Sequence, residues 1–153
     1  MFMAQSRSEN IVHIVFSTRH RAPTLVEALR PELYAVMAIL AERQKSHAWV
    51  GGVKDHVHLA VRLHPTVAVS SFIGTLKGES AKWIKKQAGD RGFRDLSWQK
   101  GYGAFSIGRS GLPELTAYID GQEEHHRVRT FKEEFRTFCE KYEVSLDERY
   151  VWE

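Results

Sequence analysis

The sequence is poor in cysteine and proline and has no long apolar stretch. It contains one cysteine, Cys139, and four prolines among 153 residues. A single cysteine excludes an internal disulfide framework and any zinc site built from several cysteines. No stretch approaches the roughly 18 uninterrupted apolar residues of a membrane-spanning helix. Segment 1–10 lacks the apolar stretch of a secretory signal peptide, so we expect a cytoplasmic protein with no membrane contact.

The charge is unevenly distributed along the chain. Residues 1–112 carry 16 Lys and Arg against 8 Asp and Glu, whereas residues 113–153 carry 6 against 11. A basic body of this kind could bind a polyanion. An uneven but merely solvated surface is an equally good interpretation of the charge alone.

Hydrophobic periodicity predicts an alternation of strands and helices. The apolar share of 42% is enough for a core, and the length favours one domain spanning 1–153. The predicted strands are 11–18, 49–53, 56–63 and 98–107; the predicted helices are 31–45, 67–87, 113–126 and 130–142; a loop is predicted at 89–95.

This order predicts an α+β fold. Its core, about 10–110, is a ferredoxin-like (RRM-like) antiparallel sheet of βαββαβ order with helices on one face. Two further helices, within about 112–143, and a short tail at 144–153 complete the predicted domain.

His56 and His58 lie two residues apart on the strand with the clearest period-two pattern. They therefore project from one face, roughly 6.5–7 Å apart along the strand, while Val57 and Leu59 face the other way. Two imidazoles so placed can converge on one metal ion, each about 2.0–2.1 Å from it. A His-x-His pair also arises by chance in a chain with eight histidines, so the motif alone leaves the metal site open.

Tyr118 and Gln122 lie four residues apart and share one face of a predicted helix. An amide oxygen suits Mg²⁺ or Mn²⁺, and imidazole pairs also suit Zn²⁺. The Tyr118 phenol could attack an electrophile and form a covalent intermediate. The alternative is a tyrosine packed on the core with its hydroxyl facing water.

Five segments, in this order along the chain, closely resemble the single-tyrosine HUH transposases of the insertion-sequence-200-like family. They are VHIVFST (12–18), GGVKDHVHL (51–59), LKG (76–78), WQKGYGAFS (98–106) and YIDGQEEHH (118–126). The resemblance covers nearly the whole chain, from about residue 10 to residue 152. Five motifs in register are far more specific than His-x-His alone.

The resemblance implies a function and roles for individual residues. His56, His58 and Gln122 would bind a divalent metal, Mg²⁺ or Mn²⁺, and Tyr118 would be the catalytic nucleophile. The enzyme would cleave and rejoin single-stranded DNA next to hairpins through a 5′-phosphotyrosine intermediate, in the cytoplasm of a bacterium or archaeon, associated with the nucleoid. The family also implies a homodimer, in which the tyrosine helix of one subunit can serve the histidines of the other. Gly121 departs from the family pattern, and glycine inside a helix costs about 0.8–1.0 kcal/mol relative to alanine, so the rigidity of the tyrosine helix is in doubt.

Two further residues are weaker candidates for the site. Asp55 could orient His56, although adjacent residues of a strand face opposite ways. His126 lies two helical turns beyond Tyr118 and could reach the rim of the site, or it could be a solvated residue at a helix end. The residues expected to contact DNA are Arg19, Arg21, Lys77, Lys82, Lys85 and Lys100, with aromatic residues interleaved.

Three alternative functions remain open at this point. The protein could be a domesticated relative that cleaves repeated genomic hairpins, a non-catalytic module that binds single-stranded nucleic acid, or a metallohydrolase that uses an activated water. The last two differ from the transposase in needing no tyrosine nucleophile.

Overall fold

Four strands form one antiparallel sheet in the computed structural model, which describes residues 7–88, 96–126, 128–149 and 151–152. The strands are β1 (Ile11–Ser17), β2 (His47–Gly52), β3 (His56–Arg62) and β4 (Gly103–Ile107). They are ordered β2-β3-β1-β4, and every neighbouring pair is antiparallel. An antiparallel sheet with βαββαβ succession is the ferredoxin-like arrangement, so the predicted fold class is confirmed.

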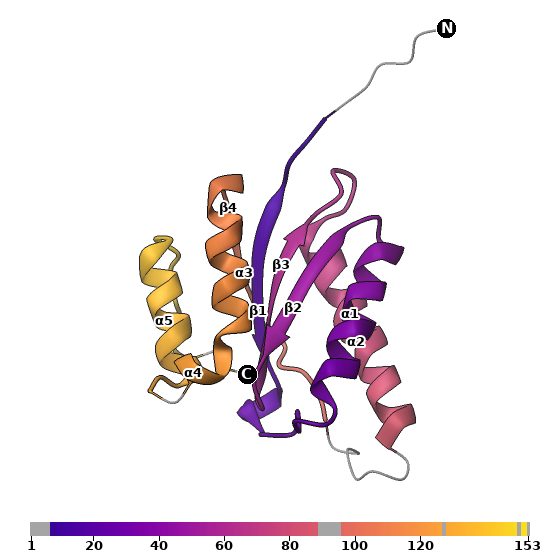
Figure 1. Cartoon of the computed structure of the whole chain (residues 1–153). Helices are drawn as coiled ribbons and strands as arrows, with labels where there is room; N and C mark the ends of the chain where they lie inside the picture. Colours follow the sequence, from indigo (N-terminus) through magenta and orange to yellow (C-terminus); the bar gives the residue numbers. More distant parts are fainter. Residues whose placement is uncertain (1–6, 89–95, 127, 150, 153) are drawn as a thin grey trace, which may run out of the picture.

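The first face of the sheet is covered by α1 (Arg30–Arg43) and α2 (Val69–Ala88), which lie side by side (Figure 1). Alternate residues of β1 and β3 point toward these helices because the side-chain period of a strand is two. The core beneath them includes Val12, Ile14, Phe16, Leu33, Met37, Val57, Leu59, Val61, Phe72 and Leu76. This layer is held together by apolar burial.

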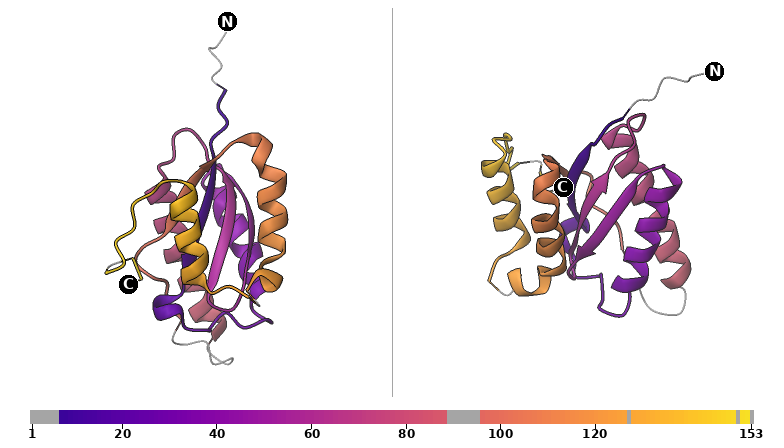
Figure 2. Two further views of the ribbon diagram at one scale, coloured as in Figure 1. Left: turned by 90° about the vertical axis from the view of Figure 1, so that its left-hand side faces the viewer. Right: turned by 45° about the horizontal axis from the view of Figure 1, so that its top comes forward.

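The second face carries α3 (Leu112–Asp120), α4 (Gln122–His125) and α5 (Phe131–Lys141). The left panel of Figure 2 looks onto this face, where α3 and α5 lie in front of the strands. The sheet is therefore covered on both faces, with the core helices on one and the C-terminal helices on the other (Figure 1). No helix within the described ranges is long and apolar enough to cross a membrane.

Two glycines allow α3 and α5 to approach the sheet closely. A Cβ atom on Gly51 of β2 would lie 2.5 Å from Cγ2 of Ile119 in α3. A Cβ atom on Gly103 of β4 would lie 2.8 Å from the ring of Phe135 in α5. These separations are shorter than van der Waals contact, so any side chain there would push the helices away from the sheet.

The predicted helix 113–126 is wrong in one respect, because it is interrupted at Gly121. The backbone there has φ −90° and ψ 14°, which ends α3 at Asp120, and α4 begins at Gln122. Any residue can adopt these angles, so the local contribution of Gly121 to the interruption is its low helix propensity.

The fourth strand is shorter than predicted. It spans Gly103–Ile107, and Trp98 forms only an isolated bridge with Thr18. Between β1 and α1, a 3-10 turn, η1 (Arg19–Arg21), follows the first strand, and η2 (Arg109–Gly111) leads into α3. The predicted loop 89–95 and most of segment 1–10 lie outside the described residues.

Candidate active site

His56 and His58 project from β3 on the second face of the sheet, where α3, α4 and α5 cover them. They alternate with Val57 and Leu59, which belong to the apolar core of the first face. Both imidazoles are fully buried, and their ring centroids lie 5.1 Å apart. Because buried polar groups are costly without partners, their neighbours define the chemistry of this face.

The carboxylate of Glu134, on α5, is the shared partner of the two imidazoles. Its Oε1 lies 2.8 Å from Nε2 of His58 and 3.3 Å from Nε2 of His56. The residue is only 3% exposed. A capping box between Thr130 and Glu133 fixes the first turn of α5, and Glu134 follows at the next position. The cap therefore helps to aim the carboxylate at the histidines.

His126 and Gln122 close the cluster from the side of α4. Nε2 of His126 lies 3.2 Å from Oε2 of Glu134 and 3.0 Å from Oε1 of Gln122. The same Gln122 oxygen lies 3.2 Å from Nε2 of His56. The structure thus brings Gln122 to the histidine pair, and it places His126 inside the cluster rather than at a solvated helix end.

Tyr118 enters the cluster from α3. Its hydroxyl donates a hydrogen bond to Oε2 of Glu134, and its ring meets that of His58 edge to face at 5.6 Å. The side chain of Gln122 reaches back to the Tyr118 carbonyl oxygen, 3.4 Å away, across one helical turn. The tyrosine hydroxyl, the histidine pair and the carboxylate are therefore assembled within a single chain.

Each imidazole of the pair is held by a second partner through its other nitrogen. Nδ1 of His56 lies 2.7 Å from Oδ1 of Asp55, and Nδ1 of His58 lies 2.8 Å from Nε2 of His13. Asp55 precedes the first residue of β3, so strand alternation does not constrain its side chain. Contacts of this kind fix the orientation of metal-binding imidazoles and leave Nε2 directed at the ion.

These contacts set opposite pKa shifts on the two histidines. Burial opposes charge on His56, but hydrogen bonds to Asp55 and Glu134 outweigh it and raise its pKa to about 9. Burial dominates at His58 and lowers its pKa to about 4. Burial also opposes charge on Glu134, yet hydrogen bonds from the three histidines hold its pKa far below the usual range.

The pKa of Tyr118 is raised by burial and by the negative charge of Glu134. In the arrangement described, the phenol is therefore held in its protonated form. A compensating positive charge near the oxygen would favour the phenolate.

The donor atoms fit a divalent metal. One ligand atom from each of His56, His58, His126 and Glu134 lies within 4.8 Å of the others. Ligands about 2.0–2.2 Å from a common ion lie at most about 4.4 Å apart, so small side-chain movements would complete the coordination. The Gln122 oxygen adjoins the same group. A set rich in imidazole suits Mn²⁺ or Zn²⁺ better than Mg²⁺, which prefers oxygen ligands.

Lys77, one of the predicted DNA contacts, has its ammonium group on the backbone of the 99–101 loop. Nζ donates hydrogen bonds to the carbonyl oxygens of Gln99 at 2.8 Å and Gly101 at 2.7 Å. Burial lowers the pKa of Lys77 to about 8. The side chain stabilises this loop, and a contact with DNA stays a prediction.

The other predicted DNA contacts lie on different parts of the molecule. Arg19 and Arg21 belong to η1, and Lys100 is exposed in the loop before β4. Lys82 and Lys85 are exposed on α2, which covers the face of the sheet opposite the cluster (Figure 1). The structure does not bring the two α2 lysines to the histidines, and their role in DNA binding also stays a prediction.

Comparison with known proteins assigns the family. A family model described as "Transposase IS200 like" matches residues 6–122, most of the chain. The chain belongs to the IS200-like transposase family. The matched region ends at Gln122, so it contains Tyr118 and the β3 histidines of this IS200-like transposase but stops before His126 and Glu134.

Relatives of this IS200-like transposase agree with the assignment. The transposases for insertion sequence element IS200 of Salmonella typhimurium and Salmonella typhi are each 27% identical to it over 130 residues, covering 82% of this chain and 85% of theirs. A crystal structure of a transposase candidate from Deinococcus radiodurans has a TM-score of 0.60 at 19% identity, covering 80% of this chain and 98% of that one. A REP-associated tyrosine transposase bound to a REP hairpin has a TM-score of 0.57 at 14% identity, covering 81% and 74%. The two solved structures support the fold.

Glu134 is the site residue that sequence reasoning missed. Phe131, Phe135 and Phe138 recur at helical spacing within the predicted helix 130–142, and Glu134 lies on the same face as they do. A carboxylate on an apolar helix face needs a buried partner. That position was the available signal for a further member of the site.

Proposed function

We propose that this transposase cleaves and rejoins single-stranded DNA next to hairpins through a covalent link between Tyr118 and a 5′-phosphate. The observation that carries the proposal is the hydrogen bond from the Tyr118 hydroxyl to Glu134, whose carboxylate also contacts His58 and His126. The nucleophile therefore lies at the cluster of metal-binding side chains. Work on chromosomal DNA would place the enzyme in the cytoplasm, at the nucleoid.

The proposed reaction exchanges one phosphoester bond for another. The Tyr118 oxygen attacks phosphorus, the bond to the 3′-oxygen breaks, and the leaving 3′-oxygen takes up a proton. Glu134 Oε2 accepts the hydrogen bond from the tyrosine hydroxyl and thereby orients the attacking oxygen, and the phenol releases its proton to water as the bond to phosphorus forms. The phosphotyrosine bond conserves the energy of the original ester, so attack by a second 3′-hydroxyl rejoins strands without ATP.

We propose that His56, His58 and Gln122, together with His126 and Glu134, hold a divalent cation. Of the two expected ions, Mg²⁺ and Mn²⁺, the imidazole-rich set suits Mn²⁺ better. Such a cation, when bound, would polarise the scissile phosphate and offset its developing negative charge. The contribution of the chain is to fix the imidazoles, through Asp55 on His56 and His13 on His58, before the ion binds.

The test is a search for a denaturation-resistant protein–DNA adduct. The protein is incubated with end-labelled single-stranded hairpin DNAs and Mn²⁺ or Mg²⁺, then separated under denaturing conditions. We expect an adduct with the wild-type protein and none with Tyr118→Phe. Tyr102→Phe, which removes the hydroxyl of another partly exposed tyrosine, serves as the matched control and should retain the adduct.

Other outcomes would favour the alternative functions. Cleavage without an adduct indicates hydrolysis by an activated water and contradicts the tyrosine mechanism. Tight binding with neither cleavage nor adduct, across many genomic hairpins, indicates a binding module.

A second candidate is a domesticated nuclease that cuts repeated genomic hairpins. The observation in its favour is the structural likeness to a REP-associated transposase that was solved with a REP hairpin. The DNA flanking the coding sequence separates the two functions. Hairpins at both ends of an element indicate a mobile transposase, whereas hairpins scattered through the genome indicate domestication.

We also propose that the enzyme acts as a homodimer, and the arrangement of Tyr118 in it can be tested by mixing variants. His56→Ala and Tyr118→Phe are each inactive in the proposed mechanism. If the tyrosine serves its own chain, as its contact with Glu134 favours, the mixture stays inactive. Recovery of adduct in the mixture would indicate that the tyrosine helix acts on the partner subunit.

A further inference from the structure

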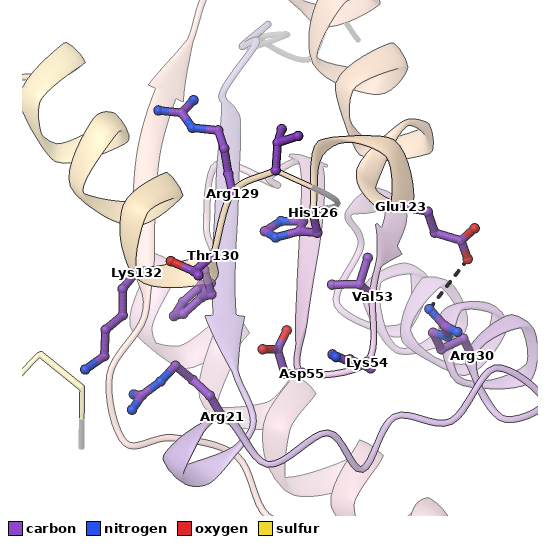
Figure 3. Close-up of a pocket in the computed structure, with 12 residues that line it drawn as sticks. Arg21, Arg30, Val53, Lys54, Asp55, Glu123, His126, Arg129, Thr130 and Lys132 are labelled. Atoms are coloured by element: carbon purple, nitrogen blue, oxygen red, sulfur yellow. Dashed lines mark ion pairs between the residues drawn. The ribbon is translucent and has the colours of Figure 1, made fainter.

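A cavity of about 770 Å³ adjoins the histidine cluster on the side of α4. Figure 3 shows His126 and Asp55 in its wall. Because His126 also contacts Glu134, and Asp55 also binds His56, a molecule in this cavity would touch the cluster itself. Pockets that enclose small ligands measure roughly 300–1,000 Å³, so the cavity has room for a nucleotide.

The wall of this cavity, hereafter the basic cavity, is dominated by positive charge. Its five cationic residues come from η1, α1, the β2–β3 turn, the α4–α5 loop and the start of α5: Arg21, Arg30, Lys54, Arg129 and Lys132. The two carboxylates in the wall are already engaged, Asp55 by His56 and Glu123 by Arg30 at 3.6 Å. None of the other four cations forms an ion pair with another described residue, so they are available to an anion.

The basic cavity also offers apolar surface. Val53 and Phe131 are buried in its wall, and Val128 is 81% exposed at the edge. A nucleotide combines an anionic phosphate with a flat, largely apolar base, which is the combination that this wall complements. A neutral apolar ligand would leave the cations without a counter-charge, and inorganic phosphate would leave the apolar wall uncovered.

Two of the cations are held in place by an aromatic ring outside the cavity wall. The Lys132 ammonium lies 5.2 Å, and the Arg21 guanidinium 6.0 Å, from the ring centroid of Trp152. Cation–π contacts of this kind limit the freedom of long side chains. Arg21 also has a positive φ of 55°, a conformation that is unfavourable for residues other than glycine and is retained where other contacts enforce it.

A smaller cavity of about 290 Å³ lies on the other side of the cluster, against Tyr118 and Glu134. Arg129 lines both cavities. A DNA strand that runs from the basic cavity toward Tyr118 therefore passes the Arg129 guanidinium, a group suited to binding phosphate.

We propose that the basic cavity binds the unpaired nucleotide next to the phosphate that Tyr118 attacks, with Lys54 and Lys132 on the phosphates that flank it. The inference rests on the proposed function and adds to it the path of the DNA strand. Of the six DNA contacts predicted from sequence, only Arg21 lies in this wall. The binding site for the DNA strand is thus formed by α5, the β2–β3 turn and η1, on a different surface from the lysines of α2.

The test compares the binding of single and double strands by two variants of equal charge. Lys54→Gln/Lys132→Gln removes two cations of the basic cavity, and Arg43→Gln/Lys45→Gln removes two exposed cations at the far end of α1. The probes are fluorescein-labelled oligothymidylate and a labelled blunt duplex. Anisotropy is measured without divalent cations over a range of salt concentrations, and melting curves check that each variant is folded.

We expect the cavity variant to bind oligothymidylate about tenfold more weakly than wild type at low salt, with a smaller salt slope. Removing the cation from one phosphate lowers the slope by about 0.7 for a single strand. Duplex binding should change no more than it does in the control variant. Unchanged oligothymidylate binding, an equal decrease on both probes, or an equal decrease in the control variant would each overturn the proposal.

This experiment separates the inference from the proposed function. Binding needs neither the metal nor the tyrosine, so the same measurement is made in the Tyr118→Phe protein. A decrease in binding that is specific to the single strand, together with no adduct in the wild-type protein, retains the basic cavity as a binding site for the DNA strand and rejects the tyrosine chemistry. An adduct with the wild-type protein, together with no decrease in binding specific to the single strand in the cavity variant, retains the tyrosine chemistry and rejects the basic cavity as the binding site.

Discussion

The two faces of β3 share one backbone and differ completely in content. Val57 and Leu59 belong to an apolar core under α1 and α2, whereas His56 and His58 meet the buried carboxylate of Glu134 under the C-terminal helices. Apolar burial contributes roughly 25 cal/mol per Å² of surface. Buried imidazoles and carboxylates must first offset their own desolvation with hydrogen bonds. The first face therefore stabilises the fold, and the second face carries the side chains proposed to bind metal and to react with DNA.

The most direct way to break the first face is to create a cavity in it. Leu59→Ala removes a fully buried side chain and should lower the free energy of unfolding by about 3 kcal/mol, as measured by urea denaturation. Mn²⁺ affinity of the folded protein should be nearly unchanged, because Leu59 points away from the cluster. A loss of metal affinity as large as that in a histidine variant would show that the two faces are not independent.

The corresponding change on the second face should affect metal binding more than stability. His58→Ala should weaken Mn²⁺ binding about 100-fold in a calorimetric titration, which corresponds to about 2.7 kcal/mol. The removal of one ligand accounts for this loss, and the control is His47→Ala, an exposed histidine on β2. Equal Mn²⁺ affinity in His58→Ala and wild type would remove this histidine from the site.

The pH dependence of stability should also come from the second face. His56 has a raised pKa of about 9, so its stabilisation is complete below pH 6.5 and is lost as the pH rises toward 9. His58 has a lowered pKa of about 4, so the protein loses stability as the pH falls from 6.5 toward 4. The metal-free protein should therefore be most stable near pH 6.5 and lose about 2 kcal/mol on either side. A flat profile between pH 5 and pH 8 in urea denaturation would contradict this.

A smaller effect should follow from disturbing the packing of α3 on β2. Gly51→Ala introduces a Cβ against Ile119 and should cost about 1–2 kcal/mol of stability. Because α3 carries Tyr118, adduct formation should fall by more than the folded fraction does. Gly78→Ala on α2 is the matched control, since a Cβ there meets nothing within 4 Å, and it should stabilise the protein by about 0.4–1 kcal/mol.

The parts of the structure that depend on local pattern could be predicted from the sequence. The period-two pattern of β3 predicted the same-face histidines, and the four-residue spacing placed Gln122 beside Tyr118. Strand 98–107 was predicted too long, because the apolar and aromatic pattern does not reveal that Lys77 ties residues 99–101 into a loop.

The role of Glu134 depends on tertiary structure. It meets His58 across 76 positions of sequence, and only the docking of α5 on the sheet brings the two together. Asp55 is a weaker candidate from the sequence because neighbouring residues of a strand face opposite ways. It lies in the turn before β3, where this alternation does not apply, and it contacts His56. Long-range docking and turn conformation are the two features that periodicity does not report.

The most direct test of the account is to locate the covalent bond. Wild-type protein is incubated with hairpin DNA and Mn²⁺, digested with a protease and a nuclease, and examined by mass spectrometry. We expect a nucleotide on the peptide that contains Tyr118, and no modified peptide when the divalent cation is withheld. A nucleotide on a different residue, or cleaved DNA with no modified peptide, would contradict it.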